Sequence, residues 1–93
     1  MVGPAVCGAC YEVPAAMADE VAAVVPSART TTRAGTPGLD LRAGVVAQLL
    51  AAGVETVEAD AWCTAESRDL YSHRRDGARS GRLAGLIRLR DDL

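Results

Sequence analysis

The sequence predicts a small domain of mixed α/β (α+β) class, in which two helices pack on a small mixed sheet. Three observations lead to this prediction. The chain has 93 residues, the length of one small domain. Two stretches carry apolar residues at helical spacing, and two others are short and rich in β-branched or apolar residues. With 49% hydrophobic and 24% charged residues, the composition is that of a folded chain.

An extended segment and a helix are expected first along the chain. Residues 1–7 are apolar and suit the end of a strand. A helix is predicted over residues 14–25, because Pro14 suits the first helical position and Pro26 stops the helix. Four apolar residues at helical spacing are expected to form its buried stripe: Met17, Val21, Val24 and Val25.

A loop and a second helix are predicted next. Residues 27–38 are rich in Thr, Gly and Pro, as loops are, and the threonines at 30–32 suit a short edge strand. The second helix is predicted over 40–52, with Asp40 as its N-terminal cap and Gly53 as its C-terminal cap. Its buried face is expected to hold Leu41, Val45, Leu49 and Ala52.

Two strands are predicted in the second half of the chain, on either side of an irregular loop. Residues 54–59 carry β-branched side chains and closely follow a helix. Residues 82–89 are apolar on both faces at their centre, which is typical of a central strand that is covered on both sides.

The overall composition argues against several classes of protein. The formal net charge is −2, whereas proteins that bind nucleic acid usually carry a basic surplus. No stretch of 18 apolar residues is present, so we expect no membrane span. The N-terminus lacks the pattern of a signal peptide, and three cysteines are an odd number. We therefore expect a cytoplasmic protein with reduced thiols.

The three cysteines leave several interpretations open. Cys7 and Cys10 form a C-x2-C pair, and Cys63 and His73 would complete the four ligands of a structural zinc site. Zinc modules usually supply two close-spaced pairs, however, and Cys63 and His73 stand far apart. The alternatives are buried or half-buried free thiols, or redox chemistry. No metal ligand is assigned to this chain.

A basic segment over residues 61–82 contains half of the ten arginines and the only Trp and His. Arginine presents a planar fork that matches phosphate or carboxylate oxygens. The alternative is a solvated loop, in which the arginines pair with neighbouring acidic residues. Tyr11 and Glu12 precede the first predicted helix. One interpretation is that both contact a pocket; the alternative is that the Glu12 carboxylate only stabilises the positive end of the helix.

Four segments together resemble one family, the laccase-domain (YfiH-type, multicopper polyphenol oxidase) proteins, now regarded as purine nucleoside phosphorylases. The segments follow the family's order along the chain: GPAVCGACYEV (3–13), GLDLRAGVVAQLLAAGV (38–54), CT (63–64) and YSHRRDGARSGRLAGLIRL (71–89). Two positions depart from the family pattern. His73 stands where an aromatic residue is usual, and Ser80 stands where a Thr is usual.

The resemblance implies that residues 1–93 are the C-terminal portion of a larger layered domain. The family's metal ligands lie in motifs upstream of the Gly-Pro-Ala segment, and none of those motifs is in this chain. An upstream polypeptide would then hold the metal, which is zinc rather than the copper of the older family name. The intact enzyme would cleave adenosine or inosine with phosphate, and adenosine deamination and methylthioadenosine cleavage are also associated with the family.

By the same resemblance, no catalytic residue is expected in this chain, which alone should be inactive. Six residues are candidates for contacting nucleoside or phosphate, the first two being the best phosphate candidates: Arg74, Arg75, Cys63, Thr64, Tyr11 and Glu12. The alternative function is a small autonomous zinc-binding or interaction module built on Cys7, Cys10, Cys63 and His73.

Overall fold

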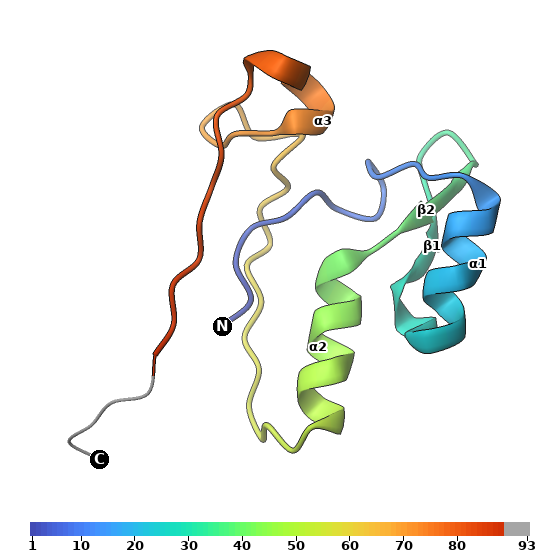
Figure 1. Cartoon of the computed structure of the whole chain (residues 1–93), viewed down its shortest axis with the longest axis vertical. Helices are drawn as coiled ribbons and strands as arrows, with labels where there is room; N and C mark the ends of the chain where they lie inside the picture. Colours follow the sequence, from blue (N-terminus) through green and yellow to red (C-terminus); the bar gives the residue numbers. More distant parts are fainter. Residues whose placement is uncertain (89–93) are drawn as a thin grey trace.

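A computed structural model describes residues 1–88 of the chain (Figure 1). A small α/β unit, with α1 and a two-stranded hairpin, occupies one end, and α2 leads from it to the second half of the chain. The mixed α/β class is therefore confirmed. The elements follow one another as α1 (Ala15–Val24), η1 (Pro26–Ala28), β1 (Arg29–Thr31), β2 (Pro37–Leu39), α2 (Leu41–Ala51), α3 (His73–Asp76) and η2 (Gly77–Arg79).

Helix α1 confirms the first predicted helix within a residue at each end, because prolines flank it as expected. Its buried face is narrower than predicted. Ala18 is fully buried, with Val21 and Val25 packed beside it. Met17 and Val24, which were expected in the stripe, are 44% and 79% exposed. The hairpin covers only the side of α1 around Ala18, so part of the apolar surface has no partner among the described residues.

Strands β1 and β2 form an antiparallel hairpin with Thr30 opposite Gly38. The edge strand predicted at 30–32 is confirmed one residue earlier, and its partner lies in what was predicted as loop. A Cβ at Gly38 would lie 2.8 Å from Cγ2 of Thr32 and 2.9 Å from the carbonyl oxygen of Tyr11. Only glycine allows this close approach of the N-terminal segment to the hairpin.

Helix α2 begins and ends as predicted. The side chain of Asp40 accepts a hydrogen bond from the backbone N–H of Ala43 at 3.0 Å, and Gly53 has a φ of 96°. The predicted buried face is wrong for Leu41, Val45 and Ala52, which are exposed, and only Leu49 is partly buried. The buried residue of α2 is Gly44, which packs against η1.

Residues 54–59 do not form the predicted strand. Only the end of this stretch meets the N-terminal segment, at the isolated parallel bridge between Val2 and Ala59, and a second such bridge joins Ala5 to Cys63. Beyond that point the two segments run side by side (Figure 1). A strand needs a partner along its length, and two separate bridges do not supply one.

The predicted strand over 82–89 is also wrong over its described part. Residues 82–88 are extended without pairing to any described strand, and Leu89 lies outside the described residues. Leu86 and Ile87 are 97% and 100% exposed. Their apolar sequence suits a covered strand, and the described chain supplies no sheet to cover it.

The core is correspondingly small. Its buried residues are Val13, Ala18, Ala28 and Leu39, with Tyr11, Val21 and Val25 packed around them. Within residues 1–88, no helix has the length and apolar character needed to cross a membrane.

Candidate functional site

A pocket of about 280 Å³ lies where the N-terminal segment, the start of α2 and the start of α3 meet. We call it the Arg74 pocket. It unites parts of all four segments that carry the family resemblance. Its walls are formed by Val6, Tyr11, Leu41, Thr64, Tyr71, Ser72, His73 and Arg74.

Arg74 and Tyr11 contact each other in this pocket. The guanidinium carbon of Arg74 lies 4.8 Å from the centroid of the Tyr11 ring, which is within the range of a cation–π interaction. Among the described residues, Arg74 forms no ion pair. Its guanidinium is therefore held in place by a ring while its hydrogen-bond donors remain available to an anion.

Arg75 is arranged quite differently. Its guanidinium donates to the backbone carbonyls of Thr64 at 3.0 Å, Ser67 at 2.7 Å and Leu70 at 2.7 Å. Its remaining donors bind the carboxylate of Asp76, and the hydrogen bond from Arg75 holds the pKa of that carboxyl below its ordinary value. All three nitrogens of Arg75 are thus used in fixing the 64–70 loop to α3.

Ser72 sets the start of α3 beside the pocket. It is buried, and its Oγ accepts a hydrogen bond from the backbone N–H of Arg75 at 3.2 Å, which caps the helix. His73, the first residue of α3, lines the pocket and is exposed. The cap therefore orders the first turn of α3, which carries His73 and Arg74.

Of the other predicted contact residues, one lies in the Arg74 pocket and two lie outside it. Thr64 lines the Arg74 pocket, whereas the buried Cys63 lines a separate depression together with Cys7 and Glu66. The Glu12 side chain is exposed, and its backbone pairs with Gly38 at an isolated bridge. Glu12 is not among the residues that line the Arg74 pocket.

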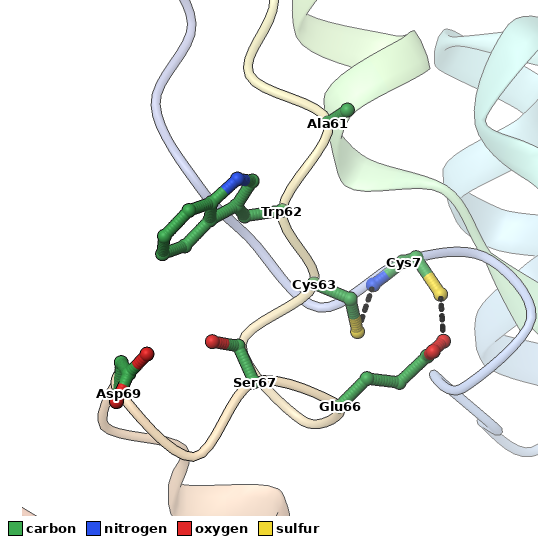
Figure 2. A pocket seen from close by; sticks show the side chains of 7 residues that line it. All are labelled: Cys7, Ala61, Trp62, Cys63, Glu66, Ser67 and Asp69. Atoms are coloured by element: carbon green, nitrogen blue, oxygen red, sulfur yellow. Dashed lines mark hydrogen bonds between the residues drawn. The ribbon is translucent and has the colours of Figure 1, made fainter.

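Cys7, Cys10, Cys63 and Glu66 form a second group, which we call the cysteine cluster. One ligand atom from each lies within 4.8 Å of all the others, and Figure 2 shows Glu66 reaching across to the thiol of Cys7. The four atoms are close enough together to hold one metal ion. His73, the fourth ligand of the alternative zinc-module interpretation, is not in this group and lines the Arg74 pocket instead.

Glu66 was not among the predicted residues, although the sequence carries a signal for it. Cys63 and Glu66 form a C-x2-E pair, which repeats the spacing of Cys7 and Cys10. A search for thiol and imidazole ligands alone passes over this second close-spaced pair.

Hydrogen bonds tie the cysteine cluster together. Oε1 of Glu66 accepts from Sγ of Cys7 at 3.4 Å and from Sγ of Cys10 at 3.2 Å. The same oxygen accepts from Arg33 at 2.8 Å. Hydrogen bonds from Cys10, Arg33 and Cys7 lower the pKa of the Glu66 carboxyl from 4.5.

Two thiols of the cluster, those of Cys10 and Cys63, differ in acidity. Desolvation, followed by hydrogen bonding to Glu66, raises the pKa of Cys10 to about 12. Burial opposes ionisation of Cys63 as well, but backbone hydrogen bonds, with that from Cys7 at 3.2 Å first among them, outweigh it and lower its pKa. Cys63 is therefore more ready than Cys10 to become a thiolate.

The donor set decides which metals the cluster suits. Thiolates are ligands for zinc or cuprous copper, and a carboxylate oxygen beside them suits zinc. A blue-copper centre needs two histidines beside its cysteine, and this chain has one His, which stands outside the cluster. The cluster thus fits a closed, thiolate-rich metal site and not an electron-transfer copper centre.

The cysteine cluster and the Arg74 pocket share the same backbone. Val6, Tyr11 and Thr64 line the pocket, and each is the sequence neighbour of a cysteine of the cluster: Cys7, Cys10 and Cys63 respectively. The same backbone segments therefore carry one set of side chains to the pocket and another set to the cluster.

Comparison with known proteins places these features in a family context. A purine nucleoside phosphorylase of Mycobacterium tuberculosis strain H37Rv is 59% identical over 94% of this chain. Proteins of the same name from Streptomyces griseus and Deinococcus radiodurans are 53% and 36% identical over 91% and 95% of it. In each case the chain spans only 34% of the relative's length.

No solved structure matches the chain. The family described as "Multi-copper polyphenol oxidoreductase laccase" matches residues 1–90, which is nearly the whole sequence. This match covers the Arg74 pocket and the cysteine cluster alike. The chain belongs to the multi-copper polyphenol oxidoreductase laccase family.

Proposed function

We propose that residues 1–93 are the C-terminal portion of a purine nucleoside phosphorylase and supply one wall of its substrate pocket. The observation that carries this proposal is the Arg74 pocket, assembled from segments shared with relatives named purine nucleoside phosphorylase. An upstream polypeptide completes the domain and carries the zinc that the resemblance implies.

Arg74 is the residue that we propose for binding phosphate. Its guanidinium has no ion-pair partner among residues 1–88 and faces a pocket, whereas the guanidinium of Arg75 is saturated by carbonyls and by Asp76. A planar fork that is already oriented loses little freedom when it binds two phosphate oxygens.

Aromatic rings beside Arg74 suit a purine nucleoside. Tyr11 and Tyr71 both line the pocket, and the exposed ring of Tyr71 offers a face on which a flat base can stack. Thr64 adds a hydroxyl that can hydrogen-bond to a ribose or a base. Cys63 and Glu12 contribute indirectly in this proposal, by positioning Thr64 and Tyr11.

The reaction that follows is phosphorolysis of the N-glycosidic bond. A phosphate oxygen bonds to C1′ of the ribose as the bond from C1′ to the purine nitrogen breaks. The bonding pair leaves with the base, which takes up a proton, and the products are the free purine and ribose 1-phosphate. This chain would hold the phosphate beside the sugar, which converts a bimolecular encounter into a positioned attack.

A bound zinc supplies Lewis-acid polarisation to such a site. Activity on adenosine and inosine, adenosine deamination and methylthioadenosine cleavage are the finer activities that we propose for the completed enzyme. Its location is proposed to be the cytoplasm, where the three thiols stay reduced.

Open apolar surface supports the need for an upstream polypeptide. A groove between α1 and α2 is lined by Val21, Val25, Ala28, Leu41, Gly44, Val45 and Gln48. Leu86 and Ile87 are exposed as well. Surfaces of this kind are normally covered in the complete domain, and the chain spans only 34% of its mycobacterial relative.

Restoring the upstream part tests the proposal. The segment that precedes the matching region in the Mycobacterium tuberculosis relative would be fused to residues 1–93, and hypoxanthine release from inosine and phosphate would be measured. The fusion should release hypoxanthine, and neither part alone should do so. A fusion that unfolds cooperatively yet releases no hypoxanthine, with phosphate present in excess, would contradict the proposal.

A further inference from the structure

We propose that Cys7, Cys10, Cys63 and Glu66 form a structural zinc site, separate from the metal that the family resemblance places on upstream motifs. It would be a closed site with four protein ligands, which is the usual form of structural zinc in proteins.

The geometry requires little adjustment. The four ligand atoms lie within 4.8 Å of one another, whereas sulfurs bound tetrahedrally at about 2.3 Å from zinc lie about 3.8 Å apart. The cluster therefore needs to contract by about 1 Å at most to enclose an ion of this size. Side-chain rotations alone can supply such a change, since Glu66 is exposed and Cys7 and Cys10 are only partly buried.

Two tight turns present the ligands in pairs. The backbone N–H of Cys10 donates to the carbonyl of Cys7 at 3.0 Å, which closes the first turn. The N–H of Ser67 donates to the carbonyl of Cys63 at 2.9 Å, which closes the second. Each turn carries its two ligands three positions apart, as the close-spaced pairs of zinc modules do.

Backbone contacts hold the two turns against each other. Ala5 and Cys63 form a parallel bridge, and the N–H of Cys7 donates to Sγ of Cys63 at 3.2 Å (Figure 2). From α2, Arg42 donates to the carbonyls of Ala5 and Trp62 and so joins both segments. The ligand pairs are thus brought together before any metal binds.

Charge around the cluster suits a metal held by anions. Zinc bound to three thiolates and a carboxylate carries a net negative charge, which needs a nearby cation. Arg33 supplies it, with its guanidinium 2.8 Å from the Glu66 carboxylate and 3.7 Å from Sγ of Cys10. Hydrogen bonds of this type orient ligands and tune metal affinity.

Zinc binding should release protons from the thiols and stabilise the fold. Zinc binding replaces the S–H protons of the three cysteines, which are released to solvent, while the oxidation states of sulfur and zinc stay unchanged. The ion would then connect residues 7–10 to residues 63–66. Zinc should therefore raise the melting temperature of the chain as well as bind to it.

Zinc and cobalt titrations of the purified, reduced 93-residue chain test this proposal. We expect one zinc per chain by elemental analysis and, with cobalt, the visible absorption of a tetrahedral thiolate complex. Cys10→Ser and Cys63→Ser should each abolish the cobalt spectrum. Glu66→Gln removes a ligand, so it should raise the dissociation constant by more than about tenfold, the loss seen when even a group that only supports a ligand is removed.

Matched variants separate this site from its alternatives. Glu58→Gln changes an exposed glutamate outside the cluster and should leave binding unchanged. His73→Ala should also leave it unchanged, and loss of zinc in that variant would overturn the ligand set. Failure of the chain to bind zinc at micromolar concentration while its helical circular dichroism is intact would overturn the proposal. Neither outcome depends on phosphorolysis.

Discussion

The guanidinium of Arg74 lies 4.8 Å from the centre of the Tyr11 ring, although the two residues come from opposite ends of the chain. Tyr11 belongs to the N-terminal segment, next to the hairpin, and Arg74 to α3. The contact therefore closes the pocket between the N-terminal segment and α3.

Removing the Arg74 guanidinium should impair the use of phosphate. In the fusion protein, Arg74→Ala is expected to raise the KM for phosphate by roughly 10- to 150-fold, the value of a charge-assisted hydrogen-bonded contact. Arg74→Lys keeps the charge without the fork and should give an intermediate KM. Steady-state kinetics with varied phosphate provide the measurement, and wild-type phosphate dependence in Arg74→Ala would exclude the assignment.

Arg75→Ala should act on stability rather than on phosphate. It leaves three backbone carbonyls of the 64–70 loop without their donor, so the melting temperature should fall by several degrees. Arg79→Ala is the matched control, because Arg79 is exposed and forms no ion pair among the described residues. Thermal unfolding followed by circular dichroism compares the two, and equal melting temperatures would disprove the structural role.

Gly38→Ala should destabilise the junction of the hairpin and the N-terminal segment. The new methyl group would lie 2.9 Å from the carbonyl oxygen of Tyr11, which is backbone and has little room to move. We expect a loss of about 1–3 kcal/mol in the free energy of unfolding, as for other overpacked sites. Gly3→Ala is the control, since a methyl group there would meet no other atom within 4 Å. Urea unfolding of both variants that gave the same midpoint would refute this account.

Glu66 should make the stability of the metal-free chain dependent on pH in the acid range. Hydrogen bonds from Cys10, Arg33 and Cys7 lower its pKa in the folded state from 4.5. Its stabilisation is therefore complete above its unfolded pKa and is lost as the pH falls through the lower, folded pKa. Melting temperatures measured between about pH 6 and pH 3 should fall less steeply in Glu66→Gln than in wild type. Glu55→Gln, which changes an exposed glutamate outside the cluster, should behave as wild type, and identical slopes in all three proteins would argue against the effect.

The sequence predicted the helices well and the strands poorly, for a physical reason. A helix satisfies its own backbone, so Pro14, Asp40 and Gly53 were enough to locate α1 and α2. A strand depends on a neighbour, and residues 54–59 and 82–88 find no continuous partner among the described residues. Their composition favours a β-strand, but no strand forms because the described residues provide no neighbouring strand.

Only some residues of the candidate site could be predicted from the sequence, and their grouping could not. Arg74, Tyr11 and Thr64 were all predicted, and the structure brings them to one pocket. Arg74 and Arg75 have different roles because only the guanidinium of Arg75 reaches the backbone carbonyls of the 64–70 loop. The sequence, in which the two arginines are adjacent, does not show this difference. Glu66 lies three residues after Cys63, and the hydrogen-bonded turn between them brings its carboxylate to the cysteines.

The wall of the Arg74 pocket and the cysteine cluster are built on neighbouring residues of the same backbone segments. Cys7, Cys10 and Cys63 are each bonded through one peptide unit to a residue of the pocket wall. A purine or an anion bound to this wall should hold it still, and the turns that carry the thiols should then open less often. In the metal-free chain, slower labelling of these cysteines by an alkylating reagent should therefore report that the pocket is occupied, without a substrate that turns over.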